Sequence, residues 1–156
     1  MGPPRVGSLT GKRYYVSFVD DWSRFTWIYF LHRKSEVMQV FKQFHAMVFT
    51  QFNKKIKIWR SDSGGEYIPK EFKAFLAFEG VVHQCGCTKQ PQQNGVVEQK
   101  HRNIQEMACA LWLHANLPKD FSAEATNTIV FLINRLPTPL LDNVSPLEKL
   151  HGYPPK

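Results

Sequence analysis

Two runs of aromatic and β-branched residues near the start of the chain most constrain what it can fold into. They are KRYYVSFV at 12–19 and FTWIYFLH at 25–32, and residues of these types favour β-strands. The segment between them, DDWSR, contains Asp and Ser, which favour turns, and it is too short for a crossover connection. The two runs therefore predict an antiparallel β-hairpin.

Helices and strands alternate along the middle of the chain. From Ser35 onward the apolar residues recur at helical spacing, so we expect a helix with Ser35 as its N-cap. Its apolar face is formed by Val37, Val40, Phe41, Phe44, Met47 and Val48. KIKIW at 55–59 alternates basic and apolar residues and predicts a short strand. Pro69 is expected to open a helix that stops at Gly80, and VVHQ at 81–84 predicts a further strand.

The second half of the chain is predicted to be mainly helical. Residues 85–95, CGCTKQPQQNG, are polar and contain glycine, which favours a loop. Helices are expected from about Val96 to Ala115 and from Pro118 to about Arg135. The expected divisions of the chain are an N-terminal arm, a core domain and a proline-broken tail, at 1–12, 13–136 and 137–156. Strands interleaved with helices predict an α/β fold in which helices cover a mixed sheet.

The composition favours a nucleic-acid partner. Lys and Arg total 20 against 13 Asp and Glu, which gives a formal net charge of +7. A positive surplus favours partners rich in phosphate, although lysines that only solvate a soluble domain would give the same total. No apolar run approaches the roughly 18 residues of a membrane helix, so we expect no membrane partner.

The cysteines predict free thiols rather than a disulfide framework. Cys85, Cys87 and Cys109 are odd in number and two of them stand one residue apart, which favours reduced thiols in an intracellular compartment. His83 precedes two of them in an H-x-C-x-C pattern, but this is not a spacing that zinc sites use. We expect a strand-end histidine beside two incidental thiols.

Two carboxylates stand where a divalent-metal site could form. Asp62, in RSDSGGEY, follows a predicted strand, and 35 residues separate it from Glu98, about one turn into the long helix. Arg102 and Gln105 follow Glu98 at i+4 and i+7, so they share its face of the helix. Phosphodiester chemistry uses carboxylates to hold two Mg²⁺ ions, and basic and amide groups to position the DNA backbone. Each residue also has a structural interpretation, with Asp62 as a turn former and Glu98 with Arg102 as a solvated pair.

Several segments carry a family resemblance. YYVSFVDDWSRFTWIYFL, RSDSGGEY, PQQNGVVEQKHR and LINRLPT resemble the integrase catalytic core of copia-type LTR retrotransposons, and the resemblance covers nearly the whole chain. It implies a ribonuclease H-like fold, in which a five-stranded mixed sheet carries flanking helices. It also implies a polynucleotidyl transferase with a DD35E carboxylate triad, whose second half matches the interval from Asp62 to Glu98.

The same resemblance assigns roles to individual residues. Asp62 and Glu98 correspond to the second and third triad positions and would bind Mg²⁺ or Mn²⁺. Gln92 and Asn94 fall on loop positions that touch the DNA end in relatives, and Arg102 falls where a basic residue approaches the phosphates. The implied reaction is metal-dependent trimming of a DNA 3′ end, followed by attack of its 3′ hydroxyl on target DNA. The family acts in the nucleus and dimerises through its later helices, so a homodimer is a further expectation.

The strand that carries the first triad aspartate in the family is not found in this sequence. Met1 stands directly before the Gly-Pro that follows that aspartate in relatives. Asp20 and Asp21 are expected to form the hairpin turn rather than to replace it. Because an incomplete carboxylate set holds Mg²⁺ less well, we expect this chain alone to be inactive or nearly so.

The missing strand is central in the family's sheet, between the second and fourth strands. Its absence would leave unpaired backbone groups, to be covered by the N-terminal arm, by another protein chain or by a rearrangement. Two functions therefore stay open from the sequence. One is a retrotransposon integrase core involved in DNA integration; the other is a repurposed, non-enzymatic module that binds nucleic acid or forms part of a larger assembly.

Overall fold

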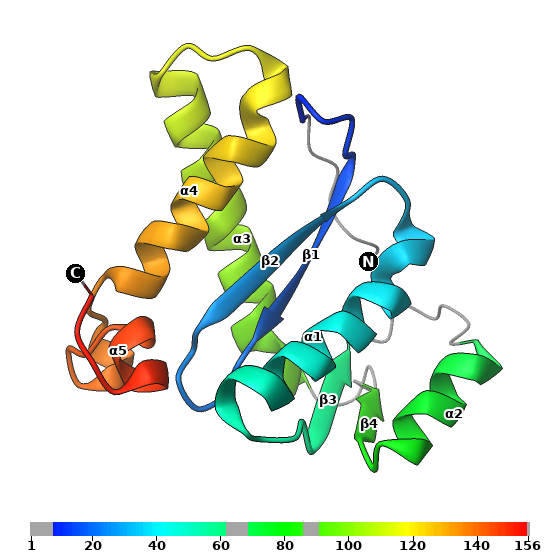
Figure 1. Cartoon of the computed structure of the whole chain (residues 1–156). Coiled ribbons are helices and arrows are strands. Elements are labelled where there is room, and N and C mark those ends of the chain that lie inside the picture. The colour runs from blue at the N-terminus through cyan, green and yellow to red at the C-terminus, as the bar shows by residue number, and fades with distance from the viewer. Residues whose placement is uncertain (1–7, 62–68, 86–90, 156) are drawn as a thin grey trace. The chain divides into compact units, whose positions relative to one another are not determined.

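The structure, a computed structural model, describes residues 8–61, 69–85 and 91–155. The chain divides into two compact units. The first spans residues 34–96, and the second combines the described residues before Lys34 with residues 97–156. Each unit contains one two-stranded sheet together with helices (Figure 1).

The second unit is built on the predicted hairpin. Strand β1 (Tyr14–Val19) pairs antiparallel with β2 (Thr26–Leu31), and Val19 lies opposite Thr26 next to the turn. The helical segments that follow are α3 (Pro91–His114), the 3-10 turn η2 (Lys119–Phe121), α4 (Ser122–Arg135), the 3-10 turn η3 (Pro139–Leu141) and α5 (Pro146–His151). The antiparallel hairpin expected from the two aromatic runs is thus confirmed.

The core of this unit lies where α3 and α4 pack together beside β2 (Figure 1). Its buried residues are Ile104, Ala108, Ile129 and Val130, with Ile28, Leu111 and Ile133 packed against them. Ile104 and Ala108 are four residues apart on α3, so one side of that helix faces the core while the opposite side is left for solvent. The packing thereby fixes which α3 side chains are available to a ligand.

The first unit joins a parallel strand pair to two helices. Strand β3 (Ile58–Ser61) pairs with β4 (Val82–Cys85), and α1 (Val37–Phe52) and α2 (Lys70–Phe78) complete the unit. A 3-10 turn, η1 (Lys34–Glu36), leads into α1. Phe41 is buried among the rings of Trp59, Phe72 and Phe75. This aromatic cluster joins α1, β3 and α2.

Several boundaries differ from the sequence predictions; α4, for example, begins at Ser122 rather than at Pro118, after the 3-10 turn η2. Ser35 lies inside η1 and does not cap α1, which begins after Glu36 without a side-chain cap. Strand β3 occupies Ile58–Ser61 instead of 55–59, because these are the residues that pair with β4, from Ile58 opposite Val82 to Ser61 opposite Cys85. Helix α3 begins at Pro91 rather than near Val96, since proline suits the first helical turn and five residues expected in a loop become helical.

The order of elements and the α/β class are confirmed, as is the stop of α2 at Gly80, which adopts the left-handed φ of 69°. Within the described residues β1 pairs only with β2, and β3 only with β4, which gives the four strands expected from the sequence. Residues 137–156, expected as a tail, contain η3 and α5, and Leu147 of α5 is buried. None of the described helices is both long and apolar enough to cross a membrane.

Candidate catalytic residues and nucleic-acid interface

The solvent-facing side of α3 carries three of the predicted site residues. Glu98, Arg102 and Gln105 are all exposed, and their spacing places them along one side of the helix. Neither Glu98 nor Arg102 forms an ion pair or hydrogen bond with any described residue, so the solvated pair considered from the sequence does not form. The helix therefore presents a carboxylate and a guanidinium, within one turn of each other, that no other described residue engages.

The other predicted site residues are only partly described. Asp62 lies outside the described residues, directly after Ser61 at the end of β3. Gln92 and Asn94 lie in the first turns of α3 and not in the loop expected from the sequence. Among the described residues no three His, Cys, Asp or Glu side chains are placed to hold a metal ion. The roles of Asp62, Gln92 and Asn94 stay predictions.

Gln105 lies close to a buried hydroxyl. Burial raises the pKa of Tyr15, and the Gln105 side chain partly opposes that shift. The contact falls short of a normal hydrogen bond, because the Tyr15 hydroxyl has no such partner within the described part of the chain. Gln105 thus differs from Glu98 and Arg102 in facing β1 as well as solvent.

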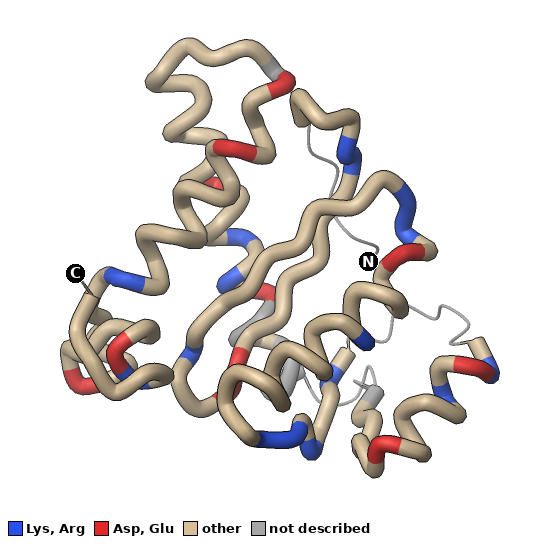
Figure 2. Tube along the Cα trace, viewed as in Figure 1, with Lys and Arg blue, Asp and Glu red and all other residues tan. Residues whose placement is uncertain are grey.

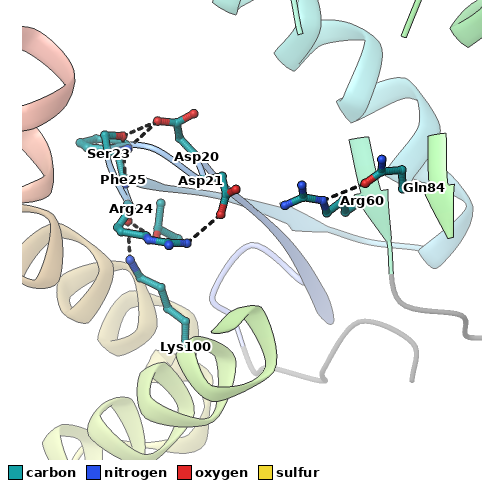
Figure 3. Close-up of polar contacts among 9 residues, drawn as sticks. Asp20, Asp21, Ser23, Arg24, Phe25, Arg60, Gln84 and Lys100 are labelled. Atoms are coloured by element: carbon teal, nitrogen blue, oxygen red, sulfur yellow. Dashed lines mark hydrogen bonds and ion pairs between the residues drawn. The ribbon is translucent and has the colours of Figure 1, made fainter. Parts of the chain in front are cut away.

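Helix α3 is anchored to the hairpin by two polar contacts. Lys100 is largely buried, and its Nζ donates a hydrogen bond to the backbone carbonyl of Arg24 (Figure 3). Burial, together with the nearby Arg24 charge, lowers the pKa of Lys100 to about 8. One residue on, the His101 ring is hydrogen-bonded through Nε2 to Ser17 Oγ and meets Tyr15 edge-on at 6.2 Å. These contacts hold the helix against β1 and the β1–β2 turn.

The two aspartates of the β1–β2 turn are engaged within the turn. Asp20 Oδ2 accepts hydrogen bonds from the Ser23 backbone N–H at 2.8 Å and from the Ser23 hydroxyl at 2.7 Å. Asp21 Oδ1 pairs with the Arg24 guanidinium at 2.8 Å (Figure 3). The expectation that Asp20 and Asp21 form the turn is confirmed.

The pair of strands β3 and β4, of which β3 ends one residue before Asp62, is held by side chains on both of its faces. On one face Arg60 donates to Gln84 Oε1 at 3.0 Å (Figure 3). On the other face His83 stacks on Trp59 with ring centroids 4.5 Å apart, and its Nε2 lies 2.8 Å from Ser61 Oγ. Burial and the Lys73 charge lower the pKa of His83, which favours the neutral ring. His83 is therefore tied to the strand end from which the chain continues to Asp62.

Basic residues are spread over both units (Figure 2). The connection between α1 and β3 adds Lys54, Lys55 and Lys57, all exposed and without an ion pair to any described residue. The formal net charge of +7 favours partners that carry phosphate groups.

Lys100 is a residue that the sequence analysis missed. Its signal was available: it stands four and eight residues before Ile104 and Ala108, in the apolar register of the helix. A lysine at a core position of an amphipathic helix needs a polar partner, and the structure supplies one in the Arg24 carbonyl.

Comparisons with known proteins show the family. Residues 5–91 match the integrase core domain. The chain is 42% identical, over 88% of its length, to the retrovirus-related Pol polyprotein from transposon TNT 1-94 of Nicotiana tabacum. It is 43% identical, over 95% of its length, to the corresponding polyprotein from transposon RE2 of Arabidopsis thaliana. The chain spans only 10% of the length of each of these relatives.

Solved integrase structures share the fold. The simian T-cell lymphotropic virus intasome, solved with PP2A regulatory subunit B56 gamma, matches with a TM-score of 0.69 and 18% identity, over 99% of this chain and 57% of that chain. The HTLV-2 integrase catalytic core domain, solved with magnesium in a trimeric form, matches with a TM-score of 0.65 and 17% identity, over 97% of this chain and 99% of that chain. These likenesses confirm the ribonuclease H-like fold. The chain therefore belongs to the integrase core domain family and is similar to the integrase core of copia-type retrotransposon Pol polyproteins.

Proposed function

We propose that the chain acts on DNA ends during retrotransposon integration, as the part of the integrase that carries catalytic carboxylates. The observation that carries this proposal is the identity of 41–43% to transposon Pol polyproteins over 88–95% of the chain. The unengaged Glu98 and Arg102 on α3, and the net charge of +7, support a surface that receives DNA.

Glu98 and Asp62 are the proposed metal ligands. Mg²⁺ prefers carboxylate oxygen, and the Glu98 carboxylate is exposed with no competing partner among the residues described, so this donor fits the ion. When bound, Mg²⁺ would activate the attacking oxygen and stabilise the leaving one. The HTLV-2 core, which shares the fold, was solved in complex with magnesium.

The remaining site residues are proposed to position DNA. Arg102, one turn after Glu98, would pair with a backbone phosphate, and the Gln105 amide would donate to the same strand. Gln92 and Asn94 precede Glu98 on α3 and are proposed to contact the DNA end. Contacts of this kind fix the register of the strand relative to the carboxylates without reading its sequence.

DNA binding is expected to weaken steeply as salt rises, because phosphate contacts release counterions. Replacing Arg102 with Gln should reduce the slope of log affinity against log salt by about 0.9, the value for one lost phosphate contact on duplex DNA. Fluorescence anisotropy with a duplex DNA end, at several salt concentrations, measures both slopes. Lys70→Gln, which removes an exposed cation from α2, should leave the slope nearer that of the wild type. A protein with no DNA affinity at any salt would favour a protein-binding role instead.

Strand transfer by the polypeptide of residues 1–156 is expected to remain at the level of its Glu98→Gln variant. Two carboxylates, Asp62 and Glu98, are proposed for the site, and Asp20 and Asp21 are already bonded within the turn. The assay uses a pre-trimmed DNA end with Mg²⁺ or Mn²⁺, on protein shown to be folded by circular dichroism. Product that disappears in Glu98→Gln would contradict this expectation and would mean that a third ligand reaches the metal.

A further inference from the structure

Lys100 stands two residues after Glu98, and at about 100° per residue the two side chains leave α3 on nearly opposite sides. Glu98 is exposed, whereas Lys100 is largely buried and donates to the Arg24 carbonyl. We propose that Lys100 is a positioning residue, whose hydrogen bond to the β1–β2 turn sets the rotation of the α3 turn that carries Glu98. This inference rests on the proposed metal-binding role of Glu98.

The acceptor of this bond is rigidly held. The Arg24 N–H donates to the Asp20 carbonyl at 2.9 Å, and the Asp20 N–H donates to the Phe25 carbonyl at the same distance. Ser23, fully buried, is bonded to Asp20 through both its N–H and its hydroxyl (Figure 3). Arg24 itself has the left-handed φ of 60°, which a non-glycine residue keeps only where its surroundings enforce it. A turn closed by so many bonds presents its carbonyl in one direction.

Packing alone does not account for a lysine at this position, because placing its ammonium against the turn costs desolvation free energy. Ile104 and Ala108, which continue the same side of α3, are apolar and buried. The Lys100 side chain is part-buried and its ammonium lies against the Arg24 carbonyl, so it is partly stripped of water. An apolar residue would avoid that cost, so the bond to Arg24 supplies orientation rather than net stability.

The anchor acts close to the proposed ligand. Lys100 bonds to the β1–β2 turn, and His101 bonds to β1. Together the two bonds fix the rotation of this turn of α3 about the helix axis and its position along that axis. Without Lys100 only His101 remains as a polar anchor in the described residues next to Glu98. Removing a group that orients a metal-binding side chain without itself touching the metal typically weakens metal affinity by about 10–100-fold.

The test measures Mn²⁺ binding by electron paramagnetic resonance in the full chain and five variants. Lys100→Met keeps the length of the side chain and removes the donor, and it should weaken Mn²⁺ binding about tenfold. Added to Glu98→Gln it should cause no further loss, because the ligand that it positions is gone. Lys100→Arg keeps a charged donor and should restore most of the affinity. Gln99→Met, an exposed neighbour on α3, should bind as the wild type does.

The outcomes separate the two proposals. Wild-type Mn²⁺ affinity in Lys100→Met, with a loss in Glu98→Gln, would overturn the positioning role and leave the metal site standing. Wild-type affinity in Glu98→Gln would instead overturn the proposed metal ligand. Amide hydrogen exchange then tests the positioning role on its own. In Lys100→Met, exchange about tenfold faster at Glu98 and Gln99, with Ile104 unchanged, supports that role. Unchanged exchange at Glu98 and Gln99 overturns it.

Discussion

Replacing Asn134 with alanine is expected to lower the free energy of unfolding by about 2–6 kcal/mol. Asn134 is buried on α4, and its side-chain amide pairs with both backbone groups of Thr26, the first residue of β2. Its Oδ1 accepts from the Thr26 N–H at 2.9 Å, and its Nδ2 donates to the Thr26 carbonyl at 2.8 Å. Alanine would leave both groups buried and unpaired, at about 1–3 kcal/mol each, and urea unfolding measures the sum.

Asn127→Ala provides the matched control for this change. Asn127 is exposed on the same helix, so its loss should change the free energy of unfolding by less than about 0.5 kcal/mol. Equal effects of the two alanine variants would contradict the prediction. They would mean that water or a rearranged side chain satisfies the backbone of Thr26 when Asn134 is removed.

The elements of this fold could be read from local pattern, but their ends could not. In the hairpin and the helices, apolar residues recur with a period that is visible within a short stretch of sequence. The extent of β3 depends instead on its pairing with β4, in which Ile58 lies opposite Val82 and Ser61 opposite Cys85. This partner strand lies far along the chain, so alternation within KIKIW could not show which residues would pair. The strand accordingly lies later than predicted, at Ile58–Ser61.

The same distinction separates the site residues that were predicted from those that were missed. Glu98 and Arg102 could be proposed from the sequence because their spacing on one helix is a local property, and both are exposed as that spacing requires. Lys100 and Asn134 act through residues 76 and 108 positions away, and both bonds reach backbone groups that any residue type would offer. Nothing in the identity of the partner residue could have signalled either contact.

Replacing Phe41 with alanine is expected to cost about 3–5 kcal/mol in the free energy of unfolding. Only 1% of its surface is exposed, and its ring lies 4.9 Å from Trp59 and 5.3 Å from Phe72 between ring centroids. The cost combines lost burial with the cavity left between α1, β3 and α2, and edge-on ring contacts add to it. Thermal and urea unfolding of the purified chain measure the change.

Phe78→Ala removes the same side chain from a site that is 87% exposed on α2, and it should cost less than about 0.5 kcal/mol. Similar losses in the two variants would mean that the ring cluster does not form the core of this unit. The cavity left by Phe41→Ala would also affect the end of β3. Trp59 packs on Phe41 only two residues before Ser61, the last residue of β3. Amide exchange along β3 should therefore quicken in Phe41→Ala even where the protein stays folded, since the strand that leads to Asp62 depends on this ring for its support.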